Sequence, residues 1–289
     1  MAELSRRTGV ILLLVSALVF STAGIFTKGV EAGAWEVIFW RGFFACLFTF
    51  GYVVCRGKLR EEFVQMGKWG WLVAIVSAAG TAAFIPSFKL TTVANVVLIY
   101  ASAPMLAAFL AWFWFGERMR KAAIVGCIAA FIGVVLIVGG SLKSINLTGD
   151  LLAFWMTLCM TVVIVIYRRA PKTPAAGPAV LASVILLFPA LIFGNPFAIE
   201  TAEIMILAAF GLIFAIASVT LSEGARRVPS GETALISTLE SPFAIALAWV
   251  LFAEVPVIAT FLGGALILAG VIGSQATPAK KQAFETISS

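Results

Sequence analysis

Residues 110–117, LAWFWFGE, recur as residues 247–254, LAWVLFAE, 137 positions later in a chain of 289 residues. Five of the eight positions are identical. Downstream, Gly126 and Gly133 match Gly263 and Gly270 at the same offset, while the upstream prolines match with a slip of one residue. The chain is therefore a tandem duplication. A half of about 140 residues is too long for a solenoid repeat but suits half of a transporter.

The composition is that of a polytopic membrane protein. Hydrophobic residues make up 62% of the chain and charged residues 12%, whereas soluble domains have about 45 to 50% and 25%. The net charge is +6, and the basic residues lie in short clusters between apolar runs. This pattern indicates anchoring in a lipid bilayer and argues against a nucleic-acid partner. The first apolar stretch, from Val10, continues to Phe26 without an Ala-x-Ala site, so it is expected to be a retained span.

Ten apolar runs have the length that crosses a hydrocarbon core as a helix. They lie near residues 9–27, 37–55, 70–88, 93–115, 122–139, 151–167, 178–194, 204–222, 232–252 and 257–274. Residues 1–142 then form a first five-helix repeat, residues 147–275 a second one, and residues 276–289 a cytoplasmic tail.

The basic residues are distributed unevenly between the two sides of the predicted bundle. Sixteen of the 20 lie on the side that holds both termini, which makes that side cytoplasmic. The four assigned to the outer side are Lys28, Arg41, Lys89 and Lys143. Because each half has an odd number of spans, the second half enters the membrane from the opposite face. Such an inverted repeat places a substrate site near the middle of the membrane.

The two helix pairs that carry the prolines, glutamates and glycines of the repeat resemble the drug/metabolite transporter superfamily, in its ten-helix EamA-type branch. Within that branch the chain resembles bacterial YddG-type exporters of aromatic and other amino acids. The resemblance covers residues 9–274 and implies an all-α membrane protein of the bacterial cytoplasmic (inner) membrane, with ten transmembrane helices as two inverted five-helix repeats. It also implies an amino acid or a related metabolite as the substrate. Ala253 in place of Gly116, and one residue fewer between Pro242 and Glu254, leave the geometry of the last loop open.

A polar stripe occupies corresponding parts of the two repeats. Asn95 and Ser102 are seven residues apart and share one helical face, as do Ser237 and Glu240 in the second copy. Facing the repeat axis, these groups could bind the two charged ends of a zwitterion. The alternative is that each bonds a neighbouring helix or backbone group, a common use of polar residues in membranes.

Pro104 and Pro242 are candidate hinges. Each lacks an N–H and is expected to loosen the preceding turn, freeing carbonyl groups near Tyr100 and Thr238. Broken helices line transporter sites. A simple kink that shapes the bundle is the alternative.

Aromatic side chains favour an apolar, adaptable cavity. The candidates are Thr81 and Phe84 in 70–88, Trp155 in 151–167, Phe20 in 9–27, and Tyr100. In a chain with 24 phenylalanines, each could equally face lipid or the core.

Glu240 is the one acidic residue well inside a predicted span, about 12 Å deep if the helix starts at Glu232. An ionised carboxylate there costs about 2.5 to 3.5 kcal/mol. Since no basic residue is expected in the middle of a span, Glu240 is predicted to face the cavity and to bind a substrate ammonium or carry a proton.

Rows of glycine and alanine on the fifth and tenth spans, such as Gly126 and Gly133, allow close helix approach. They are predicted to be scaffold, with a weak homodimer as the alternative to a monomer.

The chain has no histidine and no Walker A, HExxH or Gly-x-Ser-x-Gly motif. No metal, cofactor or enzymatic activity is therefore expected. The sequence favours a secondary transporter working by alternating access, with a channel-like or non-transporting membrane scaffold protein as the alternative.

Overall fold

A computed structural model describes residues 2–116, 121–140, 146–170, 172–225, 227, 236–237 and 239–276. All regular secondary structure in these ranges is helical, without strands. The helices are α1 (Ala2–Ser21), α2 (Ala23–Lys28), α3 (Ala34–Cys55), η1 (Arg60–Val64), α4 (Gly67–Leu90), α5 (Val93–Tyr100), α6 (Ala103–Phe115), α7 (Lys121–Gly140), α8 (Asn146–Arg169), α9 (Ala176–Phe193), η2 (Pro196–Ala198), α10 (Thr201–Ala225), α12 (Glu240–Phe252) and α13 (Ile258–Ala276).

The expected all-α membrane architecture is confirmed. In the described part of the chain, seven helices are long and apolar enough to cross a membrane, and three shorter apolar helices accompany them. The predicted span 232–252 begins in residues outside the described ranges, so the count of ten complete spans stays a prediction.

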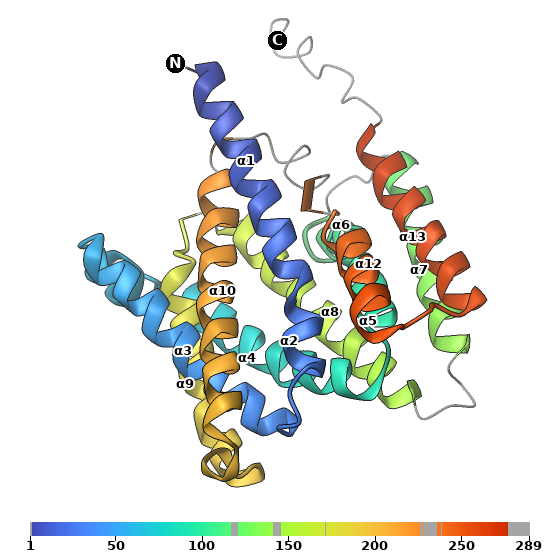
Figure 1. Cartoon of the computed structure of the whole chain (residues 1–289). Coiled ribbons are helices and arrows are strands. Elements are labelled where there is room, and N and C mark those ends of the chain that lie inside the picture. The colour runs from blue at the N-terminus through green and yellow to red at the C-terminus, as the bar shows by residue number, and fades with distance from the viewer. Residues whose placement is uncertain are drawn as a thin grey trace, which may run out of the picture.

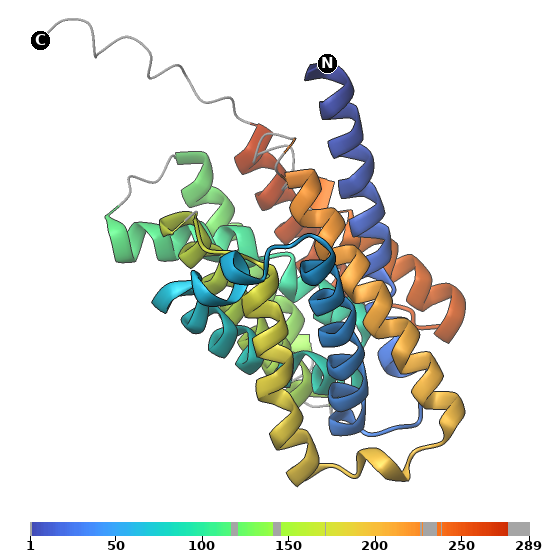
Figure 2. The same cartoon turned by 90° about the vertical axis from the view of Figure 1, so that its left-hand side faces the viewer.

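The helices form two groups around a central pair. Figure 2 shows α9, α3, α10 and α1 side by side, each packed against the next. On the other side of the molecule α7 packs along α13, and α5 and α12 lie between the groups (Figure 1). The start of α1 and the end of α13 lie at the same end of the molecule (Figure 1).

The fourth span is interrupted where Pro104 predicts it. Helix α5 ends at Tyr100 and α6 begins at Ala103, joined by a tight turn in which the Ser102 N–H donates to the Ile99 carbonyl at 3.1 Å. Exactly the same bond recurs 137 residues later, where the Leu239 N–H donates to the Ile236 carbonyl at 3.1 Å. The helix break therefore keeps the repeat register although the proline itself is shifted by one residue.

The ends of α6 and α12 also match, which settles the geometry of the last loop. Gly116 ends α6 in the left-handed conformation at φ 65°, and Ala253 ends α12 in the same conformation at φ 53°. A side chain makes this conformation about 1 to 2 kcal/mol less favourable. The turn at Ala253 directs Glu254 to an ion pair with Lys28 and to the Val93 N–H, whose nitrogen lies 2.9 Å from the carboxylate.

The glycine rows are used inside the chain, as the scaffold prediction requires. A Cβ atom placed on Gly133 would lie 2.5 Å from the carbonyl oxygen of Gly263, and the reverse placement gives the same distance. The two backbones are therefore in contact where α7 crosses α13. A homodimer, which stays a prediction, would have to use other faces of these helices.

Candidate functional site

A cavity lies where α5 and α12 meet helices α1, α2, α4 and α8. Its free space is about 10 Å³ in this conformation, room for about one water molecule. It brings together four of the residues that the sequence singled out: Phe20, Phe84, Tyr100 and Glu240. The rest of the lining is Ser21, Ala23, Gly24, Phe88, Val96, Val97 and Met156.

Glu240 supplies the acidic group of this cavity. It is the first residue of α12, directly after the break at Leu239. None of the residues that the structure describes forms a hydrogen bond or an ion pair with its carboxylate. An unpaired carboxylate at this depth is costly when ionised, so the cavity favours a proton or a cationic group beside Glu240.

Aromatic rings enclose the remaining space. Phe84 and Phe88 are in edge contact, with ring centroids 5.0 Å apart. Phe20 makes an edge contact with Phe214 of α10, with centroids 5.6 Å apart. An apolar wall around one carboxylate suits a solute with an ammonium group and an apolar side chain.

Ser102 and Asn95 are buried but serve the protein itself. The Ser102 hydroxyl donates to the Ile99 carbonyl at 2.6 Å, and the same carbonyl also accepts the Ser102 N–H. Asn95 lies on the face of α5 that meets α8 and α13, away from the cavity lining. For Asn95 and Ser102 the structure thus favours the alternative, in which each polar group bonds a neighbouring helix or backbone group.

Asp150 is the centre of a buried polar cluster that sequence reasoning missed. Its fully buried carboxylate accepts hydrogen bonds from the Thr91 hydroxyl at 2.6 Å and from the Asn95 amide at 2.9 and 3.1 Å. The Asn95 side-chain oxygen in turn accepts from the Thr260 hydroxyl at 2.6 Å. The cluster, defined as Thr91, Asn95, Asp150 and Thr260, ties α8 to the α4–α5 turn and to α13.

The other predicted binding residues are placed differently. Trp155 is 53% exposed on the outside of α8, whereas its neighbour Met156 lines the cavity, because adjacent helical positions point about 100° apart. Thr81 is partly buried one turn from Phe84 and does not reach the lining. Ser237 is partly buried outside the lining, and Thr238 lies outside the described residues.

Arg41 corrects the sequence-based assignment. It was expected on the outer side, but α3 starts at Ala34 and places Arg41 about 10 Å along the helix. Its side chain is buried, with 4% exposure. The guanidinium lies 4.7 Å from the ring centre of Phe214 and 5.5 Å from that of Phe210. Such cation–ring contacts stabilise the charge by about 0.5 to 2 kcal/mol. Placing an arginine in the middle of a membrane helix costs about 2.5 to 3.5 kcal/mol, so the rings offset part of this cost.

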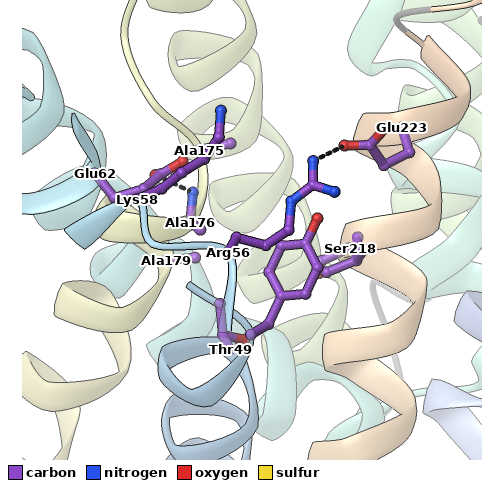
Figure 3. A pocket seen from close by; sticks show the side chains of 11 residues that line it. Thr49, Arg56, Lys58, Glu62, Ala175, Ala176, Ala179, Ser218 and Glu223 are labelled. Carbon is purple, nitrogen blue, oxygen red and sulfur yellow. Dashed lines mark hydrogen bonds and ion pairs between the residues drawn. The ribbon is translucent and has the colours of Figure 1, made fainter. Parts of the chain in front are cut away.

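A second hollow opens between α3, α9 and α10 at the end of the molecule where α1 starts (Figure 3). Its free space is about 80 Å³. In Figure 3, Arg56 reaches from the end of α3 toward Glu223 of α10, and the two side chains are 3.7 Å apart. On the other wall, Glu62 accepts hydrogen bonds from the N–H groups of Ala176 and Gly177 at 3.0 and 2.9 Å. Charged groups of both signs therefore line this mouth.

The opposite end is held by contacts between the two repeats. The Lys28 and Glu254 side chains form an ion pair, in which both are largely buried. Glu203 accepts hydrogen bonds from the backbone N–H groups of Glu31 and Ala32. In the described part of the chain, contacts between the two repeats therefore occur at both ends, and the hollow of Figure 3 opens at the end where α1 starts.

Comparisons with known proteins agree with this architecture. The sequence pattern of the EamA-like transporter family matches residues 7–139 and again residues 147–274. The chain is similar to the uncharacterized transporter YyaM of Bacillus subtilis, with 24% identity over 87% of this chain and 85% of that protein. A match to the uncharacterized transporter YxxF of the same organism has 25% identity but covers only 50% of this chain and 48% of that protein.

A solved structure titled only "Crystal structure of protein" superposes with a TM-score of 0.68. The match covers 96% of this chain and 100% of the other, at 19% sequence identity. This likeness shows the fold alone.

Proposed function

The chain belongs to the EamA-like transporter family, and from this premise we propose that it is a secondary transporter that exports amino acids, aromatic ones included, by alternating access. The observation that carries the proposal is the cavity at the crossing of two broken helices, where the carboxylate of Glu240 lies among aromatic rings without a partner in the described ranges. Broken helices at a repeat interface are where transporters bind their substrates.

The lining supports a substrate with two kinds of group. Glu240 matches an ammonium group, while Phe20, Phe84 and Tyr100 match an apolar or aromatic side chain. This combination is typical of amino acids and related amines.

The distribution of contacts supports alternating access. A hollow at one end and the Lys28–Glu254 pair at the other correspond to a state that is open on one side of the membrane. An exchange of conformations between the two repeats would open the pair and close the hollow. The open side is the cytoplasmic one if the bias of basic residues holds, and the membrane is then the bacterial cytoplasmic membrane with both termini inside.

This orientation can be tested with two single-cysteine variants, Pro174→Cys and Ile199→Cys, in a background without Cys46, Cys55, Cys127 and Cys159. The two positions flank α9 at its opposite ends. A membrane-impermeant maleimide should label position 199 in intact cells and position 174 only after permeabilisation. The reverse pattern would contradict the orientation.

Counterflow in proteoliposomes tests the function. The purified protein should exchange internal unlabelled amino acid for external radiolabelled L-phenylalanine, with saturation. Glu240→Gln should either weaken binding about 10- to 100-fold, if the carboxylate holds the ammonium group, or abolish pH-driven accumulation while exchange persists, if it carries a proton. Glu61→Gln, at a side chain with 64% exposure in η1, is the matched control and should behave as the wild type.

The outcomes separate the proposal from its alternatives. Flux without saturation or counterflow indicates a channel, and no flux of any amino acid in a broad panel indicates a non-transporting scaffold. Unchanged affinity and pH dependence in Glu240→Gln would reduce Glu240 to a packing residue.

A further inference from the structure

The buried guanidinium of Arg41 has no counter-ion among the residues that the structure describes. It contacts the rings of Phe210 and Phe214, and its Nε atom has no hydrogen-bond partner in the part of the chain that the structure describes. We propose that Arg41 binds the carboxylate of the transported solute, as the counterpart of Glu240. The inference rests on the proposed function and adds a second, anion-binding point to the transport path.

The position of Arg41 relative to the two hollows supports this role. Phe214, beneath the guanidinium, contacts Phe20, which lines the central cavity together with Glu240. One helical turn after Phe214, Ser218 lines the hollow of Figure 3. Arg41 lines neither hollow in the present state but is connected to the cavity through the Phe214–Phe20 ring pair.

The helix packing holds the guanidinium at this point. A Cβ atom on Gly211 would lie 2.7 Å from the Cβ atom of Phe44 and 2.9 Å from the carbonyl oxygen of Arg41. The glycine thus lets α10 approach α3 closely, so that the rings of Phe210 and Phe214 reach the guanidinium. Phe210 is itself stacked on Phe26 of α2, with ring centroids 5.2 Å apart.

The chemistry of the contacts favours a carboxylate as the missing partner. Aromatic rings interact with the flat face of a guanidinium, whereas its N–H donors point outward in the plane. Rings therefore leave these donors unused, and a carboxylate can accept two of them side by side. An exchangeable anion suits this place because α9 and the neighbouring turns of α10 offer no acidic side chain to Arg41.

The edge contact between Phe20 and Phe214 separates the two charged groups in the present state. If these rings turn aside, one solute can reach Glu240 with its ammonium group and Arg41 with its carboxylate. Glu240 and Arg41 would then bind the two charged ends of a zwitterion, and the aromatic rings of the cavity would contact its side chain.

Three probes distinguish the two ends: L-phenylalanine, phenethylamine, which has only the ammonium group, and 3-phenylpropionate, which has only the carboxylate. Each is tested as an inhibitor of radiolabelled L-phenylalanine counterflow in wild type, Arg41→Gln and Arg41→Lys. Arg41→Gln should weaken inhibition by 3-phenylpropionate about 10- to 100-fold and that by phenethylamine less than about threefold. Arg41→Lys keeps the positive charge but cannot donate two hydrogen bonds side by side to one carboxylate. Its inhibition constant for 3-phenylpropionate should lie between those of the wild type and Arg41→Gln.

Lys68→Gln is the matched control, since it removes an exposed cation over Trp69 at the surface of α4. It should leave all three inhibition constants unchanged. Equal weakening of all three probes by Arg41→Gln, or an unchanged constant for 3-phenylpropionate, would overturn the assignment. If Arg41→Gln fails to fold, Arg41→Lys is tested instead. The quantity compared is again the weakening of inhibition by 3-phenylpropionate relative to the weakening of inhibition by phenethylamine.

A second measurement keeps this inference separate from the transport proposal. Thermal stabilisation of the detergent-solubilised protein by 3-phenylpropionate needs no transport. If the wild type exchanges no amino acid, the proposed function fails, yet stabilisation of the wild type and not of Arg41→Gln would still support the anion site. If exchange occurs but Arg41 does not discriminate the probes, only the present inference fails.

Discussion

Gly133→Val should lower the free energy of unfolding by about 3 kcal/mol or more, because overpacking costs about 1 to 3 kcal/mol even where flexible side chains can move. Here the first added atom would meet the carbonyl oxygen of Gly263 at 2.5 Å and Ile267 Cγ1 at 2.6 Å. A backbone oxygen cannot give way unless α7 and α13 separate. The loss can be measured by titration with a denaturing detergent in mixed micelles.

Gly139→Val is the matched control on the same helix, because nothing lies within 4 Å of a Cβ atom there. It should change the stability by less than about 1 kcal/mol. Gly263→Val should resemble Gly133→Val, and the double variant should lose less than the sum, since one separation of the helices relieves both clashes. Equal losses at positions 133 and 139 would show that helix propensity and not close contact is responsible.

Asp150→Ala should also be strongly destabilising. It removes the acceptor for the Thr91 hydroxyl and for the Asn95 amide, both of which are buried. Each orphaned group costs about 1 to 3 kcal/mol, so a loss of roughly 2 to 6 kcal/mol is expected in the same titration.

Thr260→Val provides the graded comparison, because it removes only the hydrogen bond to the Asn95 oxygen. A loss of about 1 kcal/mol is expected from that single bond. The two substitutions should not be additive, since both act through Asn95. A loss below 1 kcal/mol in Asp150→Ala would show that the cluster of Thr91, Asn95, Asp150 and Thr260 does not hold these helices together.

Much of the fold follows from the sequence because it depends on periodic and repeated features. Apolar runs predict the helices, Pro104 predicts the break after Tyr100, and the glycine rows predict close helix approach, which the structure shows between α7 and α13. The repeat even predicts a second break, at Leu239. Each of these features depends on the backbone conformation of a short segment, so the residues of that segment are enough to predict it.

The site could be predicted only in part, because it depends on which face of each helix meets which partner. Phe20, Phe84, Tyr100 and Glu240 share one cavity, but Trp155 points outward one position from Met156. Hydropathy does not distinguish adjacent positions in an apolar run. Arg41 was missed because placing the helix start three residues late, at 37 instead of Ala34, left it near the outer side. Asp150 was missed because its partners are distant in sequence.

The repeat symmetry of the two helix breaks is not matched by their side chains. In register, Ala103 of the first repeat corresponds to Glu240 of the second, and Tyr100 to Ser237. Two mirror-related conformations of such a molecule cannot have equal energy. Suppose that an ionised Glu240 is exposed to water in one conformation and buried in the other. Burial of the charge costs about 2.5 to 3.5 kcal/mol, which shifts the population ratio of the two conformations by about a hundredfold. In an alternating-access cycle, the empty carrier would therefore reorient slowly unless a proton or an ammonium group neutralises Glu240, and exchange of solute for solute would outpace net efflux.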